Sequence, residues 1–406
     1  MNKQIRFLSG FIILALAILA CAVPSIGINP TQPSPEDQVA TMVASTLQVL
    51  TVEPEDITPD APAGLLPRTF YHRGADNAGL MQIFRLERDG TTRRQLTSEA
   101  ASVDDYDVSP IDGSVAYVAG NQLLLVNADG SGRRVLVDGG PVDENNPFLT
   151  LISSPVFSPD GQTVAYGYKG LNLQNMSTGA SSLVIENQIR DSGGDFMFPE
   201  ELYWPERYSP DGSKLLITLG YYEGASAAVY DPATGELVRL QGGEGALICC
   251  DDMEWSPDGS SFYSASSAAG MFNSGMWRVD ASNGMVTTLF ASSLDSNSYV
   301  YADEPYPAPD GQLYFFFAET DREIMSRTPL QPVRSAPDGV TGRTALLPTT
   351  FESMNEALWA PDASFVVVAF APNQDVYQGG RAEVVYLDGR PNVALADFAQ
   401  QMKWGP

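Results

Sequence analysis

The sequence is poor in the residues on which many enzymes rely. It contains one histidine, His72, together with three cysteines and four lysines. A Ser-His-Asp triad would have to use His72 as its base, and no G-x-S-x-G stretch occurs. So few lysines also disfavour amine chemistry. Conventional nucleophilic catalysis therefore has little support in this chain.

Basic residues are scarce as well. The chain has 23 Lys and Arg against 50 Asp and Glu, which gives a formal net charge of −27 at pH 7. Nucleic acids and anionic lipid surfaces would be repelled at long range. The candidate partners that remain are neutral or cationic ligands, metal ions and protein surfaces.

Long helices are not expected either. The 36 glycines and 29 prolines favour short strands joined by tight turns. At 406 residues and 44% hydrophobic composition, the chain is long enough to bury a large core.

The N-terminus predicts the compartment. Lys3 and Arg6 precede an apolar run that ends at Ala20, as in a secretory signal, and the run is too short for a comfortable membrane span. The segment Ile18–Cys21 resembles the lipoprotein box of bacteria, with a less usual leucine at its second position. The resemblance implies a signal peptide over residues 1–20, lipidation of Cys21 and an extracytoplasmic location. An uncleaved anchor helix and an ordinary signal peptide are the alternatives.

Residues 21–62 are predicted to form a tether. Within it, Ser34 as N-cap, Pro35 and a helical spacing of apolar residues predict a short helix near 35–50. Proline-rich stretches on both sides indicate extended linker. The helix could lie on the membrane, dock on the main domain or pair with a partner. Because it has no basic residue, membrane contact is expected only through the lipid of Cys21.

A turn motif recurs from about residue 63 onward. Its best copies read Ser-Pro-Asp-Gly, which suits a type I turn, and strand-like segments flank each copy. The motif prolines are spaced 49, 51, 47, 52 and 52 residues apart: Pro110, Pro159, Pro210, Pro257, Pro309 and Pro361. Each period predicts four short strands, the content of one propeller blade.

The repeats resemble those of a known family. Segments such as "FSPDGQTVAYGYKG" look like the WD-like repeats of TolB-type β-propellers, and the resemblance covers roughly residues 65–406. It implies an all-β propeller over residues 63–406 and, by analogy only, a binding scaffold. Three copies depart from the pattern, at Ile111, Ala308 and Ala363.

The two ends of the repeat region complement one another. Residues 68–97 match the second, third and fourth strands of a blade, and residues 397–406 match a first strand. We therefore predict a monomer with seven blades, in which the C-terminal strand closes the ring and removes exposed sheet edges. Six and eight blades are the alternatives.

Acidic residues gather in the loops before the motifs, which are expected to open on one face near the central channel. The positions five residues before each motif proline, and before Pro406, form what we call the acidic column: Asp105, Ser154, Pro205, Asp252, Glu304, Glu356 and Gln401. Its four carboxylates are candidate ligands for Ca²⁺, a basic peptide or a polyamine. Solvated loop acids without a ligand are one alternative. A carboxylate-dependent glycan hydrolase or lyase is another.

Two further features have a predicted role. Cys249 and Cys250 are adjacent in one of these loops, where a vicinal disulfide, two buried thiols and a metal or redox role are all open. Aromatic residues recur two positions before the motif prolines and are predicted to pack between blades: Phe157, Tyr208, Trp255, Trp359 and Trp404. The sequence as a whole predicts a membrane-tethered propeller that binds a protein or cationic ligand on an acidic face.

Overall fold

The computed structural model describes residues 64–406 except 192, 251–252, 269–270, 294 and 322–326. These residues belong to one compact unit, Ala63–Pro406. The predicted signal peptide, Cys21, the tether and Asp252 lie outside the described residues. Within the part of the chain that the structure describes, no helix has the length and apolarity of a membrane span.

The described residues form strands and one short 3₁₀ helix, η2, at Pro147–Leu149. The strands are β1 Phe70–Ala75, β2 Met81–Leu86, β3 Arg93–Gln95, β4 Val103–Val108, β5 Val115–Ala119, β6 Gln122–Val126, β7 Arg134–Asp138, β8 Ser153–Phe157, β9 Thr163–Gly167, β10 Gly170–Asn175, β11 Ser181–Glu186, β12 Gln188–Asp191, β13 Met197–Tyr208 and β14 Leu215–Tyr221. They continue as β15 Gly224–Tyr230, β16 Leu237–Arg239, β17 Met253–Trp255, β18 Ser261–Ser266, β19 Ser274–Asp280, β20 Val286–Ser292, β21 Tyr299–Pro307, β22 Leu313–Thr320, β23 Gln331–Ser335, β24 Thr344–Ala345, β25 Met354–Trp359, β26 Phe365–Phe370, β27 Gly380–Tyr386 and β28 Val393–Trp404.

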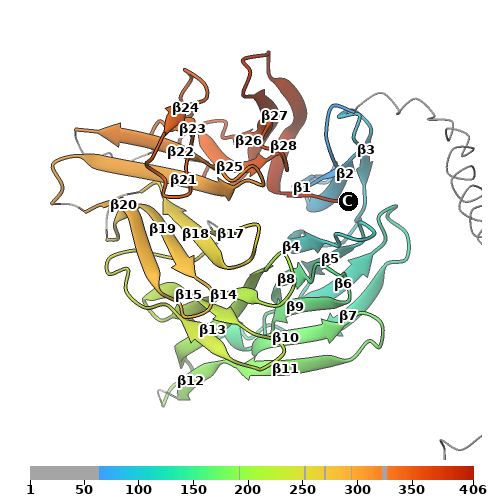
Figure 1. Cartoon of the computed structure of the whole chain (residues 1–406). Helices are drawn as coiled ribbons and strands as arrows, with labels where there is room; N and C mark the ends of the chain where they lie inside the picture. The colour runs from blue at the N-terminus through green and yellow to red at the C-terminus, as the bar shows by residue number, and fades with distance from the viewer. Residues whose placement is uncertain (1–63, 192, 251–252, 269–270, 294, 322–326) are drawn as a thin grey trace, which may run out of the picture. The chain divides into compact units, whose positions relative to one another are not determined.

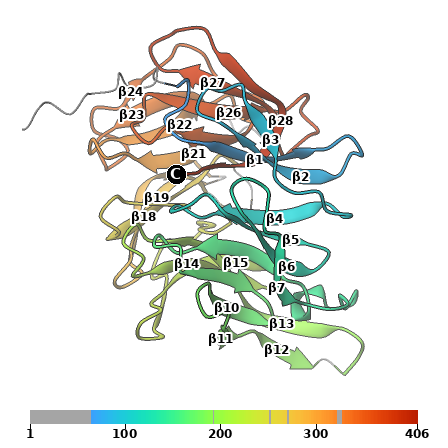
Figure 2. The same cartoon turned by 90° about the vertical axis from the view of Figure 1, so that its right-hand side faces the viewer.

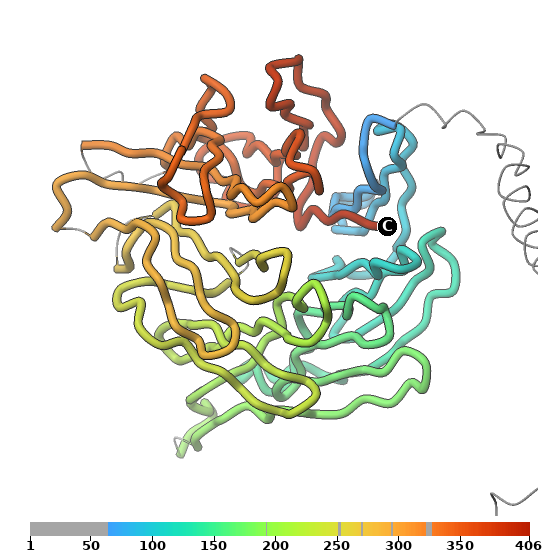
Figure 3. The backbone as a smooth tube through the Cα atoms, in the orientation of Figure 1, coloured from blue at the N-terminus to red at the C-terminus, as the bar shows by residue number. Residues whose placement is uncertain are grey.

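Neighbouring strands pair antiparallel, and the predicted all-β class is confirmed. Five sheets each come from one continuous segment: β4–β7, β8–β11, β12–β16, β17–β20 and β21–β24. A sixth sheet has the order β25-β26-β27-β28-β1-β2-β3. Within residues 64–406 these sheets follow one another around a common centre (Figures 1 and 3). We call the five continuous sheets, and the two parts β25–β27 and β1–β3 of the sixth, the strand groups. Each group has the up-and-down connectivity that the turn motif predicts.

Strand β28 is shared between two strand groups. Its segment Val393–Ala399 pairs with β27, and its segment from Gln400 to Trp404 pairs with β1. The C-terminal strand therefore lies beside the first described strand, as the labels in Figure 2 also show. Beyond the strand, the Thr69 hydroxyl donates a hydrogen bond to the carbonyl oxygen of Pro406 at 3.2 Å.

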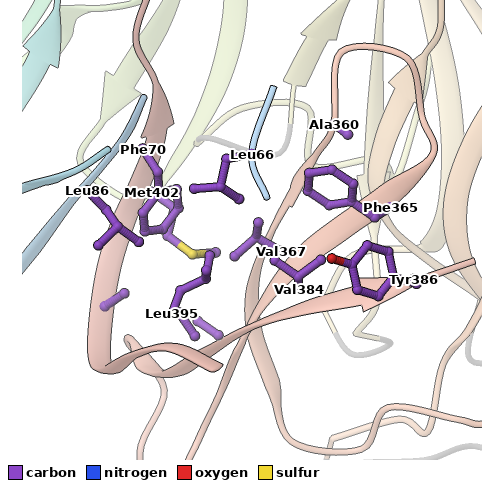
Figure 4. Close-up of a cluster of buried hydrophobic side chains, with 13 residues drawn as sticks. Leu66, Phe70, Leu86, Ala360, Phe365, Val367, Val384, Tyr386, Leu395 and Met402 are labelled. Carbon is purple, nitrogen blue, oxygen red and sulfur yellow. The ribbon is translucent and has the colours of Figure 1, made fainter. Parts of the chain in front are cut away.

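Hydrophobic side chains pack between successive strand groups. The described residues form seven buried clusters, and each draws its members from two neighbouring groups. Figure 4 shows the cluster in which Phe70 and Leu86 face Val367, Val384 and Met402. Full burial of one such side chain stabilises the folded state by about 1.5–3 kcal/mol. Burial of side chains in these clusters is therefore the main interaction that holds the strand groups to one another.

The recurring aromatic residues lie in these clusters. Phe157, Tyr208, Trp255 and Trp359 are members of four of them, and Trp404 packs against a fifth. Their predicted packing role is confirmed.

Three of the indoles also make hydrogen bonds that the sequence pattern did not predict. Nε1 of Trp255 donates to the carbonyl oxygen of Arg207 at 3.2 Å, and Nε1 of Trp359 to that of Glu304 at 2.9 Å. Nε1 of Trp404 donates to the carbonyl oxygen of Trp359 at 2.8 Å. Each bond runs from one strand group to the one before it, so the recurring tryptophan fixes the spacing of neighbouring groups as well as filling the space between them.

The only histidine is buried between aromatic rings. The ring centroid of His72 lies 5.6 Å from that of Phe70 and 5.6 Å from that of Phe84. Its Nδ1 donates a hydrogen bond to the carbonyl oxygen of Arg73 at 3.0 Å, which fixes the neutral tautomer. Burial lowers the pKa of His72 to about 4. The imidazole is therefore a packing group and has no access to a reacting molecule.

We expect this burial to make folding stability depend on pH. The unfolded chain takes up a proton on His72 near pH 6.5 and the folded chain only near pH 4. The free energy of unfolding therefore keeps its full value above pH 6.5. It falls by up to about 3 kcal/mol as the pH drops toward 4. Urea unfolding of the wild type and of His72→Phe at several pH values between 4 and 7.5 measures it. An equal pH dependence of the two proteins would contradict the expectation.

Candidate functional site

The acidic column follows a repeated irregularity of the innermost strands. The pairing register shifts at or around Asp105, Ser154, Pro205, Glu304 and Glu356. The partner strand of Gln401 shows a shift as well. A β-bulge inserts one residue, leaves backbone groups outside the ladder and re-aims the neighbouring side chains. The described column positions are thus equivalent in structure as well as in sequence.

Two column carboxylates are bonded to the backbone of the next strand group. An oxygen of Glu304 accepts the N–H of Ala357 at 2.7 Å. Glu356 accepts the N–H of Gln401 at 2.7 Å through one oxygen and the N–H of Met402 through the other. These carboxylates supply acceptors to backbone donors of the next strand group, which is a structural use of an acid.

A buried cation meets the acids where β28, β1 and β4 come together. Arg73 is 9% exposed, and its Nη1 donates to the carbonyl oxygen of Asp104 at 2.6 Å and to Oε1 of Gln401 at 2.9 Å. Nε2 of Gln401 donates to Asp105 at 3.1 Å. Burial lowers the pKa of Arg73, while the charges of Asp105, Asp104 and Glu356 act in the opposite direction. The positive charge of Arg73 therefore partly balances the negative charges of Asp105 and Glu356.

The candidate ligand residues are therefore placed as follows. Asp105 and Glu356 lie around Arg73, Glu304 lies one strand group further along, and Asp252 is outside the described residues. Among the described residues, no three His, Cys, Asp or Glu side chains are grouped to hold a metal ion. Binding of Ca²⁺ by the column stays a prediction.

Cys249 and Cys250 are joined by a disulfide in the loop before β17. Cys249 is buried, and the N–H of Cys250 donates to the hydroxyl of Thr218 at 3.3 Å. The bond is one of the three alternatives that the sequence leaves open. It is next to residues 251–252, which lie outside the described residues.

One side of the propeller carries most of the irregular chain. The loops before the innermost strands and the turns between the second and third strands of each group share this side, which we call the loop face. Seven of the twelve exposed large hydrophobic side chains among the described residues lie on it: Val142, Leu151, Phe196, Tyr221, Tyr222, Met271 and Tyr377. Leu151, Phe196, Tyr221 and Tyr222 belong to adjoining elements, and a contiguous apolar patch of this kind is typical of a binding surface.

The loop face also contains an aromatic pocket that the sequence did not predict. The pocket has a volume of about 320 Å³ and lies where β8, β9 and β13 meet the loop face. Its aromatic lining consists of Phe148, Tyr168, Tyr203 and Trp204. The described residues that line it include no Asp or Glu.

Trp204 breaks the sequence pattern of its position. It stands six residues before Pro210, where the other copies have polar residues: Asp104, Ser153, Asp251, Asp303, Asn355 and Gln400. Two glycines make room for its indole. A Cβ at Gly220 would lie 2.1 Å from Cζ3 of the indole, and one at Gly167 would lie 3.1 Å from Cδ1. The departure from a polar pattern was the available signal for this site.

Comparison with known proteins supports the fold. No family model and no curated protein matches the sequence. A puromycin-hydrolyzing peptidase of Mycobacterium tuberculosis is similar in structure, with a TM-score of 0.54, 14% identity, and coverage of 82% of this chain and 52% of that chain. TolB from Acinetobacter baumannii matches with a TM-score of 0.41 and 18% identity over 80% of this chain and 77% of that chain. A putative TolB from Agrobacterium tumefaciens matches with a TM-score of 0.40 and 20% identity over 75% and 99%.

The sheets and their arrangement around a common centre (Figure 1) make the fold a β-propeller, and TolB proteins are among the solved structures that are similar to it. At these identities the likenesses show the fold alone. The chain spans about half the length of the peptidase, so that enzyme's activity does not carry over to it.

The backbone contacts of Glu356 predict a large stability effect. Glu356→Ala removes a charged acceptor from two N–H groups and should destabilise the fold by about 2–3 kcal/mol. Glu352→Ala, an exposed position in the preceding loop, is the matched control and should change stability by less than about 0.5 kcal/mol. Urea unfolding measures both.

Equal unfolding midpoints for Glu356→Ala and Glu352→Ala would show that the carboxylate is not a structural acceptor. Millimolar Ca²⁺ added to the wild type in the same assay tests the metal prediction, because a ligand that binds only the folded chain raises the midpoint. An unchanged midpoint would remove Ca²⁺ as a ligand of the column.

Proposed function

We propose that this chain is an extracytoplasmic binding protein, held at a bacterial membrane by a lipid on Cys21, that binds a protein partner on the loop face. The observation that carries the proposal is the concentration of exposed apolar side chains on that face. The net charge of −27 adds attraction for a cationic partner. A propeller of this kind is a rigid support for variable loops.

We also propose that the ring that supports this face has seven blades. One blade combines β1–β3 with the second half of β28, and another combines β25–β27 with its first half. The other five sheets supply one blade each. The seven hydrophobic clusters support this number, since a closed ring has as many interfaces as blades.

The contacts of the acidic column favour binding over catalysis. A glycan hydrolase or lyase of the carboxylate type needs two carboxyl groups about 5–10 Å apart across one pocket, and one of them must exchange a proton with the substrate. Glu304 and Glu356 instead accept backbone N–H groups of neighbouring strands. The aromatic pocket offers no acid from its described lining. These structural contacts of Glu304 and Glu356 support binding over the enzyme alternative.

The lipid anchor is tested by metabolic labelling with radioactive palmitate. The full-length wild type should incorporate the label, and Cys21→Ala should not. The double variant Cys249→Ser/Cys250→Ser is the control and should be labelled like the wild type. Absence of label from the wild type, or its presence in Cys21→Ala, would contradict lipidation at this residue.

Partner binding is tested by affinity capture from the solubilised envelope of the bacterium that makes the chain. A partner attracted by the acidic loop face should be retained at low ionic strength and released as the salt concentration rises past about 0.15 M. Retention of no protein, or retention that is independent of salt, would contradict binding through this face.

A further inference from the structure

The walls of the aromatic pocket are fixed by a buried amide. Asn146, in the loop before β8, is 4% exposed. Its Nδ2 donates to the carbonyl oxygen of Asp195 at 2.9 Å, and its Oδ1 accepts the N–H of Met197 at 2.6 Å. These bonds tie the loop that carries Phe148 to the hairpin formed by β12 and β13. Two of the elements that surround the pocket are therefore connected by hydrogen bonds of a buried side chain.

A continuous series of aromatic rings leads out of the pocket. The ring centroid of Phe148 lies 6.4 Å from that of Phe196, which lies 6.2 Å from that of Tyr222. Tyr222 stacks on Phe198 with centroids 4.7 Å apart. Apart from Phe148, these rings come from the β12–β13 hairpin and the turn after β14. The site is thus elongated, with a pocket at one end and an aromatic surface beside it.

Two polar side chains of the pocket, Asn187 and Tyr203, have their hydrogen-bonding groups engaged by the protein. Oδ1 of Asn187 accepts the N–H of Tyr203 at 3.1 Å, and its Nδ2 donates to the carbonyl oxygen of Phe148 at 3.4 Å. The hydroxyl of Tyr203 donates to Glu201 at 2.7 Å. A sugar would need free partners for its hydroxyl groups, whereas an apolar side chain or a proline ring would not. The pocket therefore favours an apolar anchor over a carbohydrate.

The surroundings of the pocket are acidic. The segments 143–151, 168–170, 186–200 and 221–223, which form or border it, carry seven acids: Asp143, Glu144, Glu186, Asp191, Asp195, Glu200 and Glu223. They carry two bases, of which Arg190 is paired with Glu200 at 2.8 Å and Lys169 lies 5.1 Å from the ring centroid of Tyr168. The field at the rim is negative, so positively charged residues next to the anchor would be attracted.

We propose that the aromatic pocket binds an extended peptide segment of a partner protein. The segment places a proline or aliphatic side chain against Trp204 and lays its backbone along the aromatic rings, and its Lys or Arg residues lie beside the acids of the rim. Aromatic grooves recognise extended proline-containing segments in this way because the peptide loses little conformational freedom on binding. This inference rests on the proposed function and names the chemistry of its partner.

The test is a selection of random twelve-residue peptides displayed on phage against the full-length chain in detergent. The enriched peptides should combine a proline or aliphatic anchor with flanking Lys or Arg. They should bind Trp204→Ala roughly tenfold or more weakly, because truncation of a central aromatic residue has an effect of this size. Trp204→Phe keeps a ring and should retain most of the affinity. Met271→Ala, 91% exposed elsewhere on the loop face, is the matched control and should bind like the wild type.

Three results would overturn the proposal. One is a selection in which no enriched peptide distinguishes the wild type from Trp204→Ala. Another is enrichment of peptides without basic residues. A third is a neutral oligosaccharide that binds the wild type and loses its affinity in Trp204→Ala. Cooperative melting of Trp204→Ala above the temperature of the binding assay shows that its loss of affinity is not a loss of fold.

Affinity capture separates this inference from the proposed function. Capture of a salt-sensitive partner equally by the wild type and Trp204→Ala would overturn the peptide pocket and leave the binding function standing. Capture of no partner by the wild type would overturn the binding function itself.

Discussion

The pairing of β28 with both β27 and β1 is the interaction on which the rest of this structure depends. Each of five sheets forms from a continuous segment, but each covers its apolar faces only with the side chains of its neighbours. Without β28, Phe70 and Leu86 would lose Met402 and the side chains of β27, and β1 would present an open edge. A local pairing of a few residues thus determines whether all the interfaces of the proposed ring are made.

The parts of the fold that could be predicted are those governed by local chemistry. The Ser-Pro-Asp-Gly turns marked the strand ends, and the aromatic residues two positions before each proline marked the packing between groups. The acceptor role of Glu356 could not be predicted, because it depends on which N–H groups a bulge leaves outside the ladder of a different strand. The sequence did not predict β12, which adds a fifth strand to the sheet β12–β16, or the pocket near Trp204. Neither of them follows the repeat period.

The acidic residues of this protein form two populations with different roles. Two acids of the column, Glu304 and Glu356, lie at bulges and accept hydrogen bonds from the backbone of the next group. Those of the loop face, such as Asp143 and Glu223, surround an apolar surface and contribute a field at its rim. Sequence alone did not separate them, because both precede the same motifs or lie near them. In the proposed function, the first population serves the fold and the second is left to attract a cationic partner.

The position of β28 in the sequence also affects the order in which the chain folds. Thr69 and Pro406, which are bonded to each other in the folded chain, are 337 positions apart in sequence. Contacts between residues so far apart in sequence form late in folding, because the entropy cost of bringing them together comes before their gain in free energy. Until β28 arrives, the edge of β1 is open to any other extended strand. We expect the state before this pairing to be the slowest to fold onward and the most prone to aggregation.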